Sequence, residues 1–295
     1  MNTEDFLNKS TLFADNLPEP LKNTLQQFRN HANKEGILLL KNLPVESQLP
    51  ATPTDNHKSS YTSESLLATI GARLGYLVGY AQEKNGSLFH DITPLQSEEN
   101  EQSSMGSLVQ LELHTERCFH PFLPDYLLLY CLRPDPAHKG FTTHAGIRQI
   151  LPLLSQKHIE TLFQPVFRTG IDYSFGNKKT RKANGPVMSV LYGNKTDPFI
   201  RYDLDLMTGL TSKAELALQT LKEIVIDMMD GIYLEAGSLL IMDNKRCVHG
   251  RGEFKPGYDG NDRWLQRSYV LTDLGPSACD RIDGSRVITT SFSTV

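Results

Sequence analysis

The chain has 295 residues, of which 39% are hydrophobic and 22% charged, and its formal net charge at pH 7 is −4. This composition suits a globular protein with its own core, and the small negative charge gives no general attraction to nucleic acid or anionic membranes. The apolar runs are too short to cross a bilayer, and the first ten residues are too polar for a signal peptide. Four scattered cysteines without a CxxC pair predict reduced thiols and a cytoplasmic protein.

The first hundred residues predict helices and one early strand. Helix formers occupy 19–34, and Gly36 ends them before the apolar run 37–40, which is typical of a buried strand. Prolines make 44–53 an irregular connection. Ser63 is expected to cap a second helix. The apolar side of that helix follows helical spacing and consists of Leu66, Leu67, Ile70, Leu74 and Leu77.

From residue 107 onward the pattern changes to short strands. Residues 108–116 alternate between apolar and polar side chains, and 125–132 form an almost continuous apolar run. Further strands are expected around 187–192, 199–204, 238–243 and 263–272. The pattern predicts a mainly β fold, a jelly roll or β-sandwich flanked by helices. We expect one domain over 1–295, with a helical and strand-containing part at 1–105 and the jelly-roll core at 106–295.

One helix interrupts the strands near residues 212–230. Ser212 and Glu215 have the spacing of a capping box, and Gly231 is expected to end the helix. Its buried face is predicted to contain Ala217, Leu221, Ile224, Val225 and Met228. This helix is therefore an insertion between strands of the core.

The most informative residues are two histidines and a carboxylate. The segment His114-Thr115-Glu116 places an imidazole and a carboxylate on one face if it is a strand. His249, expected just after a strand end and before Gly250, adds a second imidazole. Non-haem Fe(II) oxygenases hold iron with two imidazoles and one carboxylate and leave other positions open. A His-x-Glu pair is a weak signal by itself, because most histidines are structural.

Two arginines strengthen the prediction of an anion-binding site. Arg263 and Arg267 lie on one face of the strand expected over 263–272. Burying two guanidinium groups is costly unless anions meet them, and their forked donors match carboxylates. Two carboxylates, one on a cosubstrate and one on a substrate, would account for both. The alternative is an exposed edge strand whose arginines face water.

With these residues in place, the chain resembles the clavaminate synthase-like group of Fe(II)/2-oxoglutarate dioxygenases. The similar stretches are GSLVQLELHTERCFHPFLPDYLLLYCLRPDP at 106–136, DPFIRYDLDLM at 197–207 and LLIMDNKRCVHGRGEFKPGYDGNDRWLQRSYVLTD at 239–273. The N-terminal GILLLKNLP and LPATPT are similar to bacterial free L-lysine hydroxylases of this group. The resemblance implies a double-stranded β-helix, which is a jelly-roll variant, and an enzyme that uses Fe(II), 2-oxoglutarate and O₂.

Carried over residue by residue, the resemblance makes His114, Glu116 and His249 the iron ligands. Arg263 would pair with the C5 carboxylate of 2-oxoglutarate, helped by Thr142. Related halogenases have a small residue in place of the carboxylate ligand, so a retained glutamate predicts hydroxylation. Desaturation of the same substrate uses the same residues and stays open.

The resemblance also implies substrate contacts. Arg267 would hold the α-carboxylate of an amino acid and Glu83 its α-amino group, although a shift of one residue would place Gln82 there instead. Asp203 and Asp205, on one face if their segment is extended, would face the amine or side chain of the substrate. The alternative for this pair is a turn or a salt bridge with a neighbouring arginine.

These roles predict a hydroxylase of a free basic L-amino acid, with L-lysine favoured and oxidation at C3 or C4. A cationic side chain would relieve the desolvation of two buried acids, so arginine comes next and asparagine after it. One alternative is an oxygenase for a carrier-bound residue, which would not need Arg267. Another is a jelly-roll binding module without catalysis, against which the intact ligand set argues. The expected binding partner is therefore a small-molecule amino acid. Whether the chain forms a homo-oligomer stays open. The basic run 178–182 is interpreted as a solvated loop or lid.

Overall fold

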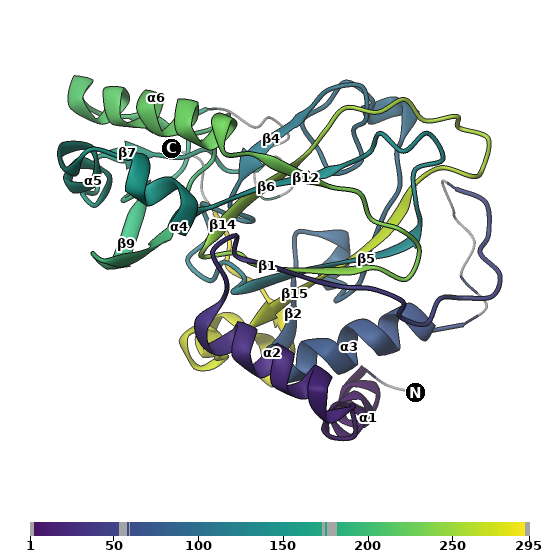
Figure 1. Ribbon diagram of the computed structural model, residues 1–295. Helices are drawn as coiled ribbons and strands as arrows, with labels where there is room; N and C mark the ends of the chain where they lie inside the picture. Colours follow the sequence, from purple (N-terminus) through teal and green to yellow (C-terminus); the bar gives the residue numbers. More distant parts are fainter. Residues whose placement is uncertain (1–2, 53–57, 59, 173–174, 176–181, 293–295) are drawn as a thin grey trace.

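The computed structural model describes residues 3–52, 58, 60–172, 175 and 182–292. Two β-sheets face each other at its centre, three helices lie against the larger sheet, and a second group of helices lies at one side of the smaller sheet (Figure 1). Within the described ranges, no helix has both the length and the apolar character needed to cross a membrane. Of the basic run 178–182, only Lys182 belongs to the described residues.

The larger sheet has seven strands. Its order is β1 (Ile37–Leu40), β13 (Leu239–Asp243), β5 (Tyr126–Arg133), β15 (Trp264–Leu271), β2 (Tyr76–Tyr80) and β16 (Val287–Ile288), with β3 (His90–Ile92) paired to another part of β15. The strands β5 and β15 are buried on both faces, which explains their almost continuous apolar sequence. Strands β1, β2 and β3 precede residue 105, so this sheet combines both predicted parts of the chain.

The smaller sheet has four antiparallel strands, and it lies opposite the larger one (Figure 1). Its order is β12 (Asp230–Ile232), β6 (Thr142–Gly146), β14 (Cys247–Arg251) and β4 (Leu111–His114). The two facing sheets form the predicted jelly-roll core. Neither β6 nor β14 has a strong sequence signal, because both contain small and polar residues without a clear apolar period.

Three helices, α1 (Thr3–Asp15), α2 (Glu19–His31) and α3 (Thr62–Leu74), cover the outer face of the larger sheet (Figure 1). Trp264 and Val270 of β15 belong to the apolar cluster beneath these helices. Leu265 and Tyr269 belong instead to the cluster between the sheets. The period of two along β15 therefore places Arg267 on the inner face, as the sequence predicts.

A second group of elements packs beside the smaller sheet around a separate apolar cluster. It contains the helices α4 (Ile147–Ile150), α5 (Gln156–Leu162) and α6 (Ser212–Asp227) and the short strands β7 (Phe167–Arg168), β8 (Val187–Met188), β9 (Leu191–Asn194), β10 (Asp197–Ile200) and β11 (Thr208–Gly209). Short 3-10 turns complete the described elements: η1 (Lys84–Gly86), η2 (Gln96–Glu98), η3 (Leu151–Leu153), η4 (Gly275–Asp280) and η5 (Ile282–Gly284). The helical insertion near 212–230 is confirmed, although it ends at Asp227.

Both predicted N-caps are wrong. The cap of α6 is Thr211, whose Oγ1 accepts a hydrogen bond from the Ala214 N–H at 3.1 Å, and Glu215 instead accepts from a backbone N–H before the helix. In α3, Ser63 already lies inside the helix. Its N–H and hydroxyl donate to Glu46 at 3.0 and 2.8 Å, so a distant carboxylate satisfies this helix start. A tertiary contact of this kind cannot be read from local spacing.

Candidate metal centre and substrate pocket

Three potential metal ligands meet where β4 and β14 pair. His114 is the last residue of β4, and it lies opposite His249 in the ladder. His249 follows the strand Leu239–Asp243, as predicted, but it lies in the middle of β14 and not at a strand end. Glu116 lies in the turn after β4 and not on a strand. Asn244 holds this turn, because its Oδ1 accepts from the Glu116 N–H at 2.8 Å and its Nδ2 donates to the Glu116 carbonyl at 3.0 Å.

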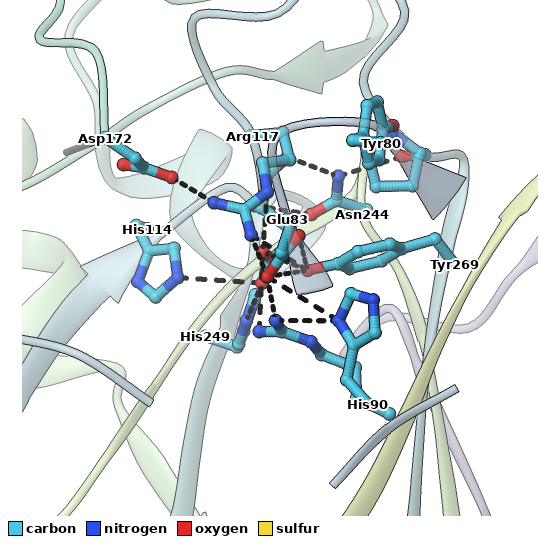
Figure 2. Close-up of polar contacts among 12 residues, drawn as sticks. Tyr80, Glu83, His90, His114, Arg117, Asp172, Asn244, His249 and Tyr269 are labelled. Atoms are coloured by element: carbon cyan, nitrogen blue, oxygen red, sulfur yellow. Dashed lines mark hydrogen bonds and ion pairs between the residues drawn. The ribbon is translucent and has the colours of Figure 1, made fainter. Parts of the chain in front are cut away.

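The side chains of the three residues converge on one point, and Figure 2 shows both histidines directed toward it. Oε2 of Glu116 is 3.3 Å from Nε2 of His249 and 3.9 Å from Nε2 of His114. Nδ1 of His114 lies 2.8 Å from the carbonyl oxygen of Glu112, a contact that orients the ring with Nε2 inward. Two imidazole nitrogens and a carboxylate oxygen, all within 4.8 Å of one another, fit the donor set that Fe(II) accepts.

Burial and neighbouring charges shift the pKa values of the three ligand side chains in different directions. Burial raises the pKa of Glu116, but Arg267 and Arg117 outweigh it and hold this pKa well below its usual value. Burial lowers the pKa of His114, but the nearby Glu116 carboxylate reverses the effect and raises it to about 9. Burial, followed by the charge of His114, lowers the pKa of His249 to about 4. The site thus concentrates negative charge on Glu116, and a bound metal cation would replace the proton on His114.

Arg263 and Thr142 lie together at another part of the same cavity, which has a volume of about 1240 Å³. Nη2 of Arg263 donates to Oγ1 of Thr142 at 3.3 Å, and both residues are buried. Burial lowers the pKa of Arg263. Thr142 begins β6 and Arg263 immediately precedes β15, so the two sheets each contribute one of these residues.

Arg267 and Glu83 form a buried ion pair beside the three potential ligands. Nη1 of Arg267 is also 3.6 Å from Oε1 of Glu116. The hydroxyl of Tyr269 donates to the same Glu116 oxygen at 2.9 Å and lies 3.1 Å from Oε2 of Glu83. Gln82 instead donates to a backbone carbonyl at 2.6 Å. Of the two residues considered at this position, Glu83 is therefore the one that contacts Arg267.

Arg117 is a pocket residue that the sequence prediction misses. Its guanidinium forms ion pairs with Glu83 and Asp172, and its Nη2 donates to the hydroxyl of Tyr269 at 3.2 Å (Figure 2). The same group lies over the ring of Phe175, 4.9 Å from its centre. Arg117 has a φ of 55°, which turns the chain sharply after Glu116. The one feature of the sequence that points to a role for Arg117 in the pocket is its position directly after the His-x-Glu motif.

The expectation that Asp203 and Asp205 share a face of an extended segment is wrong. Oδ1 of Asp203 accepts from the N–H groups of Asp205 and Leu206 at 3.0 and 2.8 Å, so the segment is a turn. Asp203 bridges to His114 through the backbone, and burial raises its pKa to about 6. Asp205 is exposed, although both acids line the cavity. The alternative of a turn is therefore correct, and it leaves Asp203 as the better-placed acid.

A jelly roll with two histidines and a glutamate converging between its sheets, and with buried arginines beside them, defines a non-haem Fe(II) oxygenase. The family described as taurine catabolism dioxygenase TauD, TfdA family matches residues 7–269, and the chain belongs to this family. It is an Fe(II)- and 2-oxoglutarate-dependent dioxygenase.

Named relatives agree with this assignment. The chain is 36% identical to the L-lysine 3-hydroxylase of Catenulispora acidiphila over 98% of this chain and 82% of that protein. It is 34% identical to clavaminate synthase 2 of Streptomyces clavuligerus over 91% of this chain and 84% of that protein, which confirms the predicted resemblance.

Solved structures agree as well. Asparagine oxygenase with Fe(II), 2S,3S-3-hydroxyasparagine and succinate superposes with a TM-score of 0.90 at 35% identity, covering 97% of this chain and 89% of that one. The oxygenase OrfP with Fe, succinate and (3S)-hydroxy-L-Arg gives 0.87 at 32% identity, covering 96% and 90%. OrfP also has a structure with Fe and alpha-ketoglutaric acid. The predicted jelly-roll fold and the predicted cofactor and cosubstrate are therefore confirmed.

Proposed function

We propose that this dioxygenase hydroxylates C3 of a free L-amino acid with a basic side chain, and that L-lysine is its substrate. The observation that carries the proposal is a buried Arg267–Glu83 pair beside the three metal ligands, with the acid Asp203 next to His114. The arginine and glutamate match the two charges of a free amino acid, and Asp203 matches a third charge on its side chain.

Each part of the metal and cosubstrate site has one role in this proposal. His114, Glu116 and His249 hold Fe(II), which together with 2-oxoglutarate and O₂ supplies the oxidation of an unactivated C–H bond. Arg263 and Thr142 bind the C5 carboxylate of 2-oxoglutarate. The protein contributes position, because the buried pocket holds the target carbon near the metal and excludes bulk water.

The α-groups of the substrate are bound by the ion pair already present in the pocket. Arg267 takes the α-carboxylate, because its guanidinium is buried and beside Glu116. Glu83 takes the α-ammonium, because it is an acid within reach of the same arginine. A carrier-bound residue has no free carboxylate to pair with Arg267, so this pairing favours a free amino acid.

The side chain of the substrate is bound near Asp203. This acid forms no ion pair with a lysine or arginine among the residues that the structure describes, and burial raises its pKa to about 6. An ammonium group would supply the missing positive charge and favour the ionised carboxylate. Asp205 and Glu112 also line the cavity and add to its preference for a cation. L-Arginine is the second candidate for the same reason.

Oxidation at C3 is supported by three relatives. The names of these proteins specify a 3-hydroxylase of lysine, a 3-hydroxyasparagine complex and a (3S)-hydroxyarginine complex. Their side chains differ, whereas the position of the α-groups relative to C3 is the same in every amino acid. A pocket that fixes the α-groups through Arg267 and Glu83 therefore favours C3. The L-lysine 4-hydroxylases among the relatives are 26–28% identical to this chain, whereas the L-lysine 3-hydroxylase is 36% identical.

Succinate release with Fe(II) and 2-oxoglutarate across the twenty common amino acids tests the proposal. We expect L-lysine to give the highest kcat/KM, with mass spectrometry showing one added oxygen and NMR placing it on C3. A strong preference for arginine or asparagine would show that L-lysine is not the substrate. A product lighter than the substrate by two mass units would indicate desaturation. Absence of turnover with every free amino acid would contradict the proposed function.

Asp203→Asn should raise the KM for L-lysine by on the order of 10- to 100-fold, because a buried cation loses its counter-charge. The KM for 2-oxoglutarate should stay within about 3-fold, since Asp203 is remote from the carboxylate anchor. Asp205→Asn is the matched control and should have the smaller effect, because this carboxylate is exposed. Steady-state kinetics decides the matter. Equal effects of the two variants would exclude Asp203 as the side-chain contact.

The cysteines bear on the cellular location. The four cysteines Cys118, Cys131, Cys247 and Cys279 are unpaired in the structure, as expected of reduced thiols, and we propose a cytoplasmic location on this basis. The single domain over 1–295 stays a prediction, and a homo-oligomer stays open.

A further inference from the structure

Arg251 is a buried arginine in the cavity to which neither the sequence prediction nor the proposed function gives a role. It lies in β14 two residues after His249, so both side chains are on the same face of the strand. Its side chain lines the same cavity as Arg263 and Thr142, and only 4% of the residue is exposed. In the β6–β14 ladder, Arg251 is directly opposite Thr142.

The guanidinium of Arg251 is incompletely satisfied. Its Nη1 donates to the backbone carbonyls of Ser107 at 3.3 Å and Gly252 at 3.1 Å. Its Nε and Nη2 are buried and have no hydrogen-bond partner among the described residues. A buried, always-charged donor without an acceptor is strongly unfavourable, so these atoms indicate a ligand that the protein itself does not provide.

Arg263 is a second buried cation near Arg251, so this part of the cavity, as far as the structure describes the chain, has two positive charges and lacks a negative charge to balance them. Both guanidinium groups lie over the ring of Phe254, at 5.4 Å for Arg251 and 5.9 Å for Arg263. In the described part of the chain, neither has a carboxylate oxygen within 4.0 Å. The nearby Asp135 uses its carboxylate to accept three backbone N–H groups.

We propose that Arg251 and Arg263 together bind the C5 carboxylate of 2-oxoglutarate, and that Arg251 supplies the second guanidinium of a two-arginine anchor. A carboxylate has about four lone-pair positions, enough to accept from two guanidinium groups and from the hydroxyl of Thr142. The anchor makes the pocket selective for a dicarboxylate, because a 2-oxo acid with an apolar end would leave both cations unpaired. The inference rests on the proposed role of Arg263.

Calorimetric titration of the enzyme loaded with Mn(II) in place of Fe(II) tests the anchor without turnover. The two ligands are 2-oxoglutarate and 2-oxopentanoate, which has the same five carbons but a methyl group in place of the C5 carboxylate. Arg251→Gln should weaken 2-oxoglutarate binding by about 10- to 100-fold and leave 2-oxopentanoate binding within about 2-fold. Arg251→Lys, which keeps the charge but loses the fork, should fall between wild type and Arg251→Gln.

Arg133→Gln is the matched control, because Arg133 also donates to backbone carbonyls in this part of the fold, at Gly260 and Pro50. It should lower the melting temperature without changing the ratio of the two affinities. If Arg251→Gln behaves like this control while Arg263→Gln still weakens 2-oxoglutarate binding, Arg251 is not part of the carboxylate anchor. The proposed function then stands. If Arg263→Gln has no effect either, the cosubstrate site itself is misplaced.

Discussion

His114→Ala should reduce succinate release below detection. The substitution removes one of three ligand atoms that lie within 4.8 Å of one another, and it leaves Glu116 and His249 unable to hold the metal on one face. His249→Ala should give the same loss, because the two rings face each other across the β4–β14 ladder with centroids 4.6 Å apart. A Co(II) titration followed by visible absorption measures the ligand field directly and separates metal binding from turnover.

His158→Ala is the control, since His158 lies on α5 within the separate helical group. It should bind Co(II) and turn over as wild type does. Thermal unfolding of the metal-free proteins shows whether the variants fold; loss of a ligand alone should leave this unfolding almost unchanged. Retained turnover in His114→Ala would remove the iron assignment, and an unaltered Co(II) spectrum would do so even if activity were lost.

Arg267→Ala should weaken amino-acid binding by about 30-fold or more and change 2-oxoglutarate binding little. Truncating one member of a buried charge pair costs on the order of 2–5 kcal/mol, and Arg267 is paired with Glu83 and close to Glu116. The substituted enzyme should also lose its preference for L-lysine over L-lysine amide, which lacks the carboxylate that Arg267 binds. The separate KM values for substrate and cosubstrate provide the measurement.

Arg263→Gln is the reciprocal control and should weaken 2-oxoglutarate binding more than amino-acid binding. Both arginines are buried and line the same cavity, but Arg267 is paired with Glu83 whereas Arg263 donates to Thr142. Equal losses for the two ligands in Arg267→Ala would contradict this division of labour. The substitution leaves Arg117 as the remaining arginine partner of Glu83.

The inward direction of Arg267 could be predicted because it depends on a short-range rule. A period of two along β15 points Arg267 inward wherever that strand lies, whereas Arg263 immediately precedes the strand. The prediction of Glu116 was right in its residue and wrong in its reason. This side chain reaches the histidines from a turn that Asn244 holds, not from a strand face.

Residues that act through distant partners could not be predicted in the same way. Arg117 gains its position from a left-handed backbone angle and from Glu83 and Asp172, which are far from it in sequence. The start of α3 depends likewise on Glu46 and not on a local cap. The turn at Asp203 depends on hydrogen bonds from the following backbone N–H groups to its carboxylate. Aspartate side chains often form such local hydrogen bonds, so the sequence pattern alone does not distinguish a turn from an extended segment.

The sequence by itself determined the reaction class, because two histidines, a glutamate and the stretches around them resemble one group of Fe(II)/2-oxoglutarate dioxygenases. It also determined the basic shape of the core, since long apolar strands must be covered on both faces. Only the tertiary structure decided how these donors meet: two sheets bring Thr142 to Arg263, and a ladder between β4 and β14 brings His114 to His249. The reason is that ligand geometry and pocket charge depend on contacts between segments far apart in the chain, and no local period encodes them.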